Sequence, residues 1–150
     1  MTNEKNYQSL LENVFIGGAD QAREAHTNEG LDVIIDLRAE TVNVEDNLPR
    51  IHMPIVDDAS QQDESVKAAI EYVVQAQQEG KKVYFHCSGG RNRTGTVAMG
   101  TLLHLGKATT VEEAERLATS IRPAINVKPE LKEVLQNMYE KTKIEMSKKN

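Results

Sequence analysis

The chain has 150 residues, 39% of them hydrophobic, and this length fits one compact domain but not two ordinary ones. A single cysteine excludes a framework of internal disulfide bonds, and a net charge of -5 argues against nucleic acid or an anionic membrane as the main partner. Residues 1–10 lack a signal-peptide pattern, and no apolar run has the length of a membrane span. We therefore expect a cytoplasmic protein without membrane insertion.

Short apolar runs alternate with amphipathic ones, and this pattern is typical of an α/β fold. In the first half of the chain it predicts a strand over 14–16, a helix over 20–29, and strands over 32–37 and 51–56. The run 32–37 is continuously apolar, as in a strand that is covered on both faces. Pro54 interrupts the strand 51–56, which favours an edge position or an early end.

The second half of the chain contains a further strand and four helices. A helix is predicted over 65–79, and a strand, expected to be the central one, over 83–85. Three more helices follow. They are predicted over 96–105, over 111–120 behind a Thr109/Thr110 cap, and from Pro129 to about Met146. Residues 141–150 are expected to form a frayed tail. The fold predicted is a single α/β domain over 1–150, with a core at about 13–138 and a mostly parallel sheet of about four to five strands flanked by helices.

The segment after the central strand carries a cysteine and an arginine with five residues between them, two of which are glycines. Glycines allow successive backbone N–H groups to point into one concavity, and the positive end of the next helix lies beside it. Such a concavity binds a tetrahedral dianion and lowers the pKa of a thiol at its floor to about 3.5–7.5. Cys87 is therefore the candidate nucleophile, and Arg93 can present a planar fork to two phosphate oxygens. A buried structural cysteine would need neither the glycines nor the arginine.

The stretch His86-Cys87-Ser88-Gly89-Gly90-Arg91-Asn92-Arg93-Thr94 resembles the signature of the protein tyrosine phosphatase superfamily. Three further stretches, at 14–18, 35–38 and 121–125, are similar to landmarks of its dual-specificity branch, in the usual order. The resemblance implies a hydrolase that needs no metal or cofactor, and a phosphate-binding loop between the central strand and a helix. It also implies that Thr94 hydrogen-bonds to the departing thiolate and that His86 orders the loop.

Two residues of this loop depart from the common pattern. Asn92 stands where many members of the superfamily carry glycine, and we expect the loop to form because asparagine tolerates left-handed backbone angles. Arg91 adds a basic residue inside the loop. It either raises the positive potential at the mouth of the site or is a solvated charge.

The resemblance also implies a general acid, an aspartate on the loop after an upstream strand. Pro54-Ile55-Val56-Asp57-Asp58 lies in the corresponding place. The order Pro-Ile-x-Asp favours Asp57 over Asp58 as the proton donor to the leaving oxygen. The same residue would then act as base for the water that hydrolyses the cysteinyl phosphate. Alternatively, both aspartates are turn residues that cap the next helix.

Other ionisable residues lie outside this signature. Asp36, Arg38 and Glu40 lie at the carboxyl end of the strand 32–37, and we predict ion pairing there in preference to substrate contact. His26, His52 and His104 have no metal-ligand spacing with the single cysteine, so we expect no metal site.

Together these features favour a phosphomonoester hydrolase of the dual-specificity type that acts on phosphorylated protein through a shallow cleft. A phosphoinositide or another small phosphate ester is the alternative substrate, motivated by Arg91 but opposed by the acidic net charge and by the uncharged Ser88. A rhodanese-like sulfurtransferase also uses a thiolate in an amide-lined loop, but needs neither Asp57 nor Arg93. A phosphate-binding module without turnover is opposed by the presence of Cys87, Arg93 and Asp57. The sequence does not indicate the oligomeric state.

Overall fold

The computed structural model of the protein describes residues 6–40, 47–56 and 62–141. Its main elements follow in the order β1 (Gln8–Leu11), β2 (Val14–Gly17), α1 (Ala22–Glu29), β3 (Val33–Arg38), β4 (Arg50–Ile55), α2 (Asp63–Gln78), β5 (Val83–His86), α3 (Arg93–His104), α4 (Val111–Ile121) and α5 (Pro129–Leu135). A short 3-10 helix, η1 (Ala19–Gln21), precedes α1, and a π-helical stretch, η2 (Gln136–Lys141), follows α5.

The five strands form one sheet in the order β1-β2-β5-β3-β4. Only β1 runs antiparallel to its neighbour; the other pairs are parallel. The prediction of a mostly parallel sheet with the strand before Cys87 at its centre is therefore confirmed. The edge position of the strand that contains Pro54 is also confirmed, and the pairing register between β3 and β4 shifts between Asp36 and Arg38.

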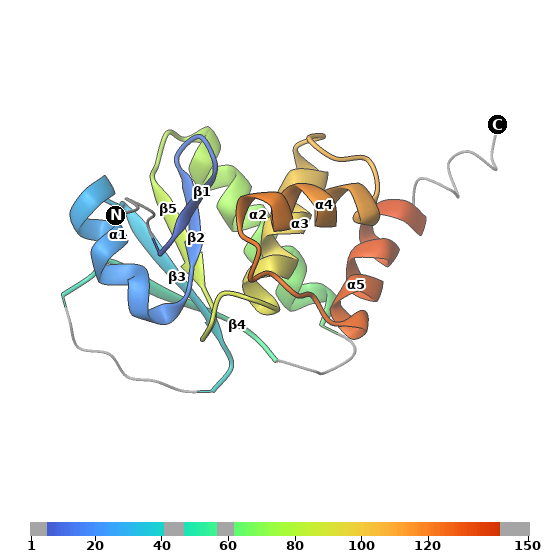
Figure 1. The fold of residues 1–150 in the computed structure, drawn as a ribbon, viewed down its shortest axis with the longest axis horizontal. Coiled ribbons are helices and arrows are strands. Elements are labelled where there is room, and N and C mark those ends of the chain that lie inside the picture. The colour runs from blue at the N-terminus through green and yellow to red at the C-terminus, as the bar shows by residue number, and fades with distance from the viewer. Residues whose placement is uncertain (1–5, 41–46, 57–61, 142–150) are drawn as a thin grey trace.

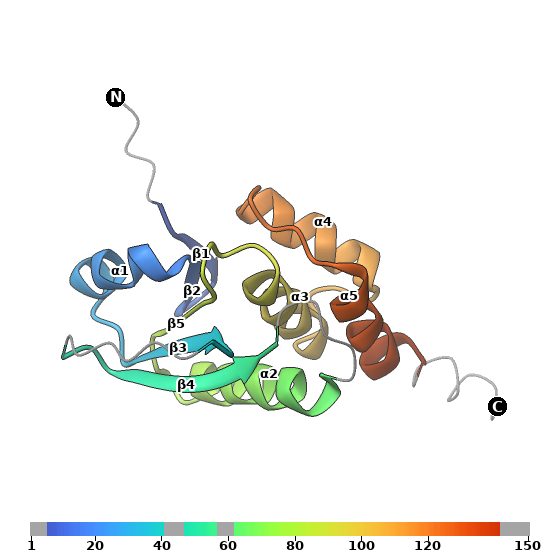
Figure 2. The ribbon, with the colours of Figure 1, turned by 90° about the horizontal axis from the view of Figure 1, so that it is seen from below.

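Helices cover both faces of the sheet (Figures 1 and 2). Helix α1 lies on one face, where Ile34 of β3 and Tyr84 of β5 belong to a small apolar cluster with Ala22 and Ala25. Helices α2 to α5 lie on the other face, and the neighbouring strand residues, such as Ile35, point into this larger core. Because side chains alternate along a strand, the apolar residues of β3 fill both layers.

Helix α3 is the innermost helix, with every residue from Arg93 to Leu103 buried. Gly100 allows this close packing, since a Cβ atom at that position would collide with Ile70 of α2. The prediction of a small, apolar helix packed tightly on the sheet is confirmed. The helix begins at Arg93 instead of Thr96, because the loop leads directly into its first turn. In this turn the Thr96 amide donates to the Asn92 carbonyl at 2.9 Å.

The ends of the chain depart most from the sequence-based expectation. Strand β1 was not predicted, because this four-residue edge strand buries only Leu10 and so has no apolar run. The Thr110 cap of α4 is confirmed, with its hydroxyl accepting from the Glu113 amide at 3.0 Å. Helix α5 ends at Leu135 and passes into η2, earlier than the predicted end; the expected tail lies outside the described residues from 142 on.

Within the described ranges, no helix has the length and apolar character required to cross a membrane.

Candidate active site

The loop from Cys87 to Asn92 joins the carboxyl end of β5 to the first turn of α3. Gly90 has a φ of +70°, and a Cβ atom there would lie 2.6 Å from the backbone of Gly17. The start of η1, just after β2, also supports the loop through a hydrogen bond from the Ala19 amide to the Ser88 carbonyl at 3.0 Å. Glycine at position 90 is thus required both by backbone angle and by close approach.

Cys87 lies at the floor of this loop and is only 4% exposed. The Thr94 hydroxyl lies 3.2 Å from Sγ and 2.8 Å from the amide nitrogen of Cys87. Burial by itself raises the pKa of the thiol, but hydrogen bonds from the Thr94 side chain and from the amides of Thr94, Arg91 and Gly90 outweigh it, so the pKa is lowered. The loop therefore favours the thiolate, the nucleophilic form.

Arg93 is 4% exposed, and its guanidinium is held by a residue just after β3 and by the last residue of β4. Nη1 and Nη2 donate to the two carboxylate oxygens of Glu40 at 2.6 Å and 3.2 Å, and Nη1 also donates to the Ile55 carbonyl at 3.3 Å. The bond with Arg93 is the main reason why the pKa of Glu40 falls to about 2. The ion pairing predicted after β3 is present, and one of its partners is the candidate phosphate clamp.

The second ion pair at this strand end joins Asp36 and Arg38 at 2.8 Å. Burial raises the pKa of Asp36, but the hydrogen bonds from Arg38 outweigh that effect and the pKa is lowered.

His86, which precedes the candidate nucleophile, is fully buried. Its Nδ1 donates to the Cys87 carbonyl at 2.8 Å, and its Nε2 lies 3.4 Å from Nη1 of Arg50. Burial lowers the pKa of His86, so a neutral ring with a proton on Nδ1 fits these contacts.

Asn92 supports the loop in a different way from the one predicted. Its φ of -88° lies in the right-handed region, so the tolerance of asparagine for left-handed angles is not used and that reasoning was wrong. The side chain instead accepts a hydrogen bond from the Lys128 amide at 2.8 Å. Asn92 thereby fixes the loop to the segment between α4 and α5.

Arg122 is a supporting residue that sequence reasoning did not identify as part of the site. Its guanidinium donates to the carbonyls of Gly90 at 2.9 Å and Gly89 at 3.1 Å, so those carbonyls point away from the concavity. It also donates to the Asn6 carbonyl and to the Gln8 side chain at 3.0 Å and 2.8 Å. The available signal was the Ile121-Arg122-Pro123 stretch, which places an arginine between apolar residues.

A pocket of about 270 Å³ opens above the thiol, lined by Cys87, Ser88, Gly89, Arg91, Asn92, Arg93, Asn126 and Lys128. The structure thus brings the predicted loop residues together and adds two from the segment before α5. A larger hollow of about 500 Å³, bordered by α2 and by Met53 of β4, shares no lining residue with the pocket above the thiol, and its Glu71 and Glu79 carboxylates disfavour a phosphate. Asp57 and Asp58 lie outside the described residues, and the described part of the chain holds no cluster of metal-ligating side chains.

The contact between Thr94 and Cys87 leads to a first prediction. Thr94→Val should shift the pH profile of Cys87 alkylation by iodoacetate to higher pH and lower kcat about tenfold, because the thiolate loses a charge-assisted hydrogen bond. Thr101→Val is the matched control, since this buried threonine of α3 bonds only to the Val97 carbonyl of its own helix in the described structure. An unchanged profile for Thr94→Val, or an equal shift in both variants, would contradict the prediction.

The loop lies at the carboxyl end of a central parallel strand, with a buried thiol at its floor and an arginine at the start of the next helix. This arrangement defines the class of cysteine-dependent phosphatases. Residues 14–141 match the family model of the dual specificity phosphatase catalytic domain, and the chain belongs to this family. The match decides against the rhodanese-like interpretation.

Two curated relatives are similar in sequence. The dual specificity protein phosphatase PHS1 of Arabidopsis thaliana is 29% identical over 116 residues, which is 72% of this chain. The phosphatidylglycerophosphatase and protein-tyrosine phosphatase 1 of Homo sapiens is 29% identical over 76 residues, or 51% of this chain. The chain spans only 12% and 37% of the lengths of these two proteins.

Solved structures with the same fold include Tk-PTP in its active form, with a TM-score of 0.76 and 22% identity over 90% of this chain and 97% of that one. PTPMT1 in complex with PI(5)P gives a TM-score of 0.77 and 19% identity over 94% and 99% of the two chains. Human DUSP28 gives a TM-score of 0.77 and 17% identity over 93% of this chain and 97% of the DUSP28 chain. At these identities the likeness concerns the fold.

Proposed function

We propose that the chain hydrolyses phosphomonoesters through a cysteinyl-phosphate intermediate. The observation that carries the proposal is the stabilised thiol of Cys87 beneath an amide-lined pocket that Arg93 borders. Sγ attacks phosphorus while Arg93 and the loop amides bind the phosphoryl oxygens, and the bond to the leaving oxygen breaks. Water then attacks the phosphocysteine, releasing inorganic phosphate and restoring a thiolate that Thr94 stabilises.

Asp57 is proposed as the general acid, with Asp58 as the alternative. Support comes from the end of β4, where the Ile55 carbonyl accepts a hydrogen bond from Arg93. Asp57 follows two residues later in the sequence, a span of at most about 7 Å along the chain from Ile55. In this role Asp57 protonates the leaving oxygen and afterwards takes a proton from the attacking water.

Replacement of each aspartate in turn by alanine tests this assignment. Asp57→Ala should lower kcat about 100-fold for phenyl phosphate and less for p-nitrophenyl phosphate, because p-nitrophenolate leaves with little help from an acid. Asp58→Ala is expected to cause a much smaller loss with both substrates. Steady-state kinetics of the two variants decide, and the reverse order of losses would assign the acid to Asp58.

Two substrate classes follow from this chemistry. A phosphorylated protein is the substrate that membership in the dual specificity family favours. A phosphoinositide or another small phosphate ester is the second candidate, favoured by the polar walls of the pocket and by Arg91 at its mouth. The names of two similar proteins, a phosphatidylglycerophosphatase and a PI(5)P complex, support the second class as well.

We further propose a single domain over 1–150 with a cytoplasmic location, since a lone thiolate nucleophile suits a reducing compartment. The net charge of -5 opposes a nucleic-acid partner.

Turnover by the full chain tests the proposed function. It should hydrolyse p-nitrophenyl phosphate in buffer that contains a chelator, and rapid acid quench should yield a peptide phosphorylated on Cys87. Absence of turnover would contradict the proposal and would favour a phosphate-binding module without catalytic activity. Activity that depends on an added metal would contradict the mechanism.

A further inference from the structure

Arg122, the residue that follows α4, is packed against the backbone of the phosphate-binding loop and is only 8% exposed. Its Nε donates to the Gly90 carbonyl at 2.9 Å, and its Nη2 donates to the Gly89 carbonyl at 3.1 Å. A Cβ atom on Gly90 would lie 2.7 Å from Nη2. The guanidinium and the two glycines therefore form one closely packed unit.

The charge of Arg122 has no carboxylate partner among the residues that the structure describes. Besides the two loop carbonyls, its acceptors are the Asn6 carbonyl at 3.0 Å and the side-chain oxygen of Gln8 at 2.8 Å, and both are neutral. The other buried guanidinium of the site, that of Arg93, is bound by the carboxylate of Glu40. Since a buried charge is costly unless an opposite charge compensates it, the pairing of Arg122 needs an explanation.

Cys87 supplies the missing negative charge. Burial lowers the pKa of Arg122, as does the charge of Arg91, whereas the anionic forms of Tyr84 and Cys87 act in the opposite direction. Burial also raises the pKa of Tyr84, whose hydroxyl donates to the Gly18 carbonyl at 2.6 Å, so this side chain stays neutral. The thiolate of Cys87 is then the anion that compensates Arg122.

Two peptide units of the loop connect the guanidinium with the thiol. The Gly89 carbonyl shares a planar peptide unit with the Gly90 amide, and the Gly90 carbonyl shares the next one with the Arg91 amide. Arg122 binds both carbonyls, and both amides donate hydrogen bonds that lower the pKa of Cys87. Hydrogen bonds in such a chain polarise one another. A cation on the carbonyl side therefore strengthens the amide donors on the thiol side.

The other ionisable side chains near the thiol are engaged differently. Arg93 is held by Glu40, and the neutral ring of His86 donates to the carbonyl of Cys87. Arg91 is exposed to solvent, which screens its charge. Arg122 differs from all of them because it is bonded to the same peptide units that bind the thiol.

We propose that Arg122 is a positioning residue for the cysteine nucleophile: its charge stabilises the Cys87 thiolate through two peptide units of the loop, and the start of β1 holds it in place. The proposal rests on the proposed phosphatase function and adds to that site a residue outside the Cys87–Arg93 loop. It also makes the N-terminal segment part of the active site, since Gln8 meets Arg122 across 114 positions of the chain.

Gln8→Glu tests whether the charge of Arg122 acts on the thiol or only its hydrogen bonds support the loop. A glutamate keeps an oxygen acceptor for Nη1, but its carboxylate neutralises the guanidinium. We expect the pH profile of Cys87 alkylation by iodoacetamide, an uncharged reagent, to shift to higher pH in the full chain. The rate should be about fivefold lower on the acid side, with an unchanged plateau. A purely structural role predicts an unchanged profile, because the hold on Arg122 is kept.

Variants of Arg122 itself provide a second measurement. Arg122→Met removes the charge and should lower the acid-side alkylation rate about tenfold. Arg122→Lys keeps the charge without the planar fork and should restore part of that rate. If Arg122→Met does not fold, which circular dichroism would reveal, the comparison of Gln8→Glu with the wild type decides.

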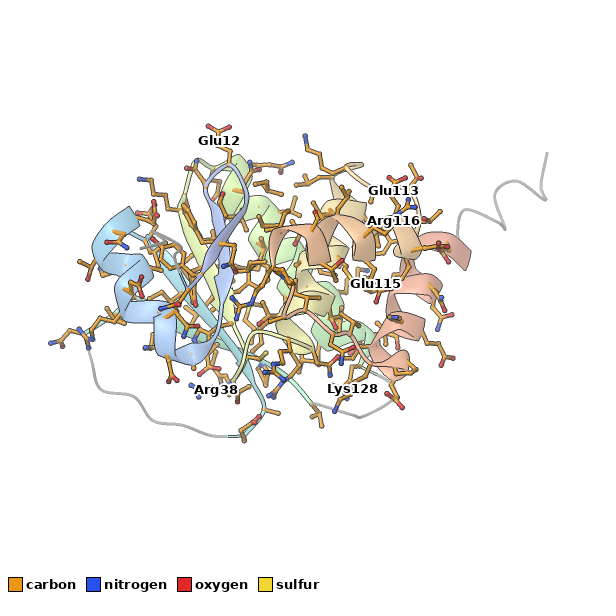
Figure 3. All side chains as sticks on the ribbon, viewed as in Figure 1. Glu12, Arg38, Glu113, Glu115, Arg116 and Lys128 are labelled. Carbon is orange, nitrogen blue, oxygen red and sulfur yellow. The ribbon has the colours of Figure 1, made fainter. Side chains whose placement is uncertain are left out.

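Two matched controls carry the same changes at exposed positions. Ser9→Glu adds a carboxylate at the next residue of β1, whose side chain points to the other face of the strand. Arg116→Met removes an exposed arginine of α4, the helix that also carries Glu113 and Glu115 (Figure 3). Both variants should leave the alkylation profile unchanged.

The outcomes separate this proposal from the phosphatase function. A shifted profile in Gln8→Glu without a shift in Ser9→Glu supports the role of Arg122. Coincident profiles of Gln8→Glu and the wild type would overturn it, and so would an equal shift in Ser9→Glu. A wild-type chain whose Cys87 is alkylated with the expected profile, but which does not hydrolyse p-nitrophenyl phosphate, would instead overturn the phosphatase function.

Discussion

Cys87→Ser should abolish hydrolysis of p-nitrophenyl phosphate, with a loss in kcat on the order of 10⁵-fold. The loop lowers the pKa of the thiol through hydrogen bonds from Thr94 and from backbone amides. The same contacts cannot ionise an alcohol near neutral pH, because its pKa starts several units higher. A serine hydroxyl therefore lacks the charge with which Sγ attacks phosphorus. Release of inorganic phosphate over long incubations measures the residual rate.

The serine variant must keep its fold and its phosphate-binding loop for this result to be informative. Circular dichroism should be unchanged, and tungstate, a phosphate-like oxyanion, should still bind in calorimetry because Arg93 and the loop amides remain. Such a variant holds substrate without turnover, so it is also the reagent for trapping ligands from phosphopeptide and phosphoinositide panels. Activity equal to that of the wild type would refute the role of Cys87.

Arg93→Lys should lower kcat/KM for p-nitrophenyl phosphate about 10³-fold, although the positive charge is kept. The guanidinium is oriented by both oxygens of Glu40 and by the Ile55 carbonyl. An ammonium group cannot reproduce this planar arrangement, and it leaves one oxygen of Glu40 without its partner. Steady-state kinetics and oxyanion binding should both reveal the loss.

Two further variants separate charge from geometry at this position. Arg116→Lys, on the exposed surface of α4, is the matched control and should retain full activity. Glu40→Gln keeps the side-chain shape but removes the charge that orients Arg93, and we expect a loss of about tenfold. Retention of more than a tenth of the activity by Arg93→Lys would contradict a clamp that depends on the planar fork.

Much of the active-site loop could be predicted because its parts are adjacent in the sequence. Cys87, Arg93 and Thr94 lie within eight consecutive positions, so a strand, two glycines and a helix suffice to bring them together. The order of elements and the central place of β5 were predictable for a similar reason, since periodicity and apolar runs report local structure. Strand β1 was missed because a short edge strand leaves no such pattern.

The supporting residues could not be predicted, because they reach the loop from distant parts of the chain. Glu40 meets Arg93 across 53 positions, and Arg122 meets Gly90 across 32. Asn92 was assigned a backbone role, whereas its side chain secures the segment that carries Lys128. No periodicity or spacing encodes such pairs.

The amino-acid sequence by itself indicated the α/β framework of this protein and the residues proposed for its chemistry, Cys87 as the nucleophile and Arg93 as the phosphate clamp. Only the tertiary structure decided how that chemistry is held and what surrounds it. Glu40 holds the Arg93 guanidinium, Arg122 binds the loop carbonyls, and Asn126 and Lys128 line the pocket. The physical reason is that a local motif needs only its own backbone conformation, whereas orientation and selectivity depend on side chains that folding brings from other strands and helices.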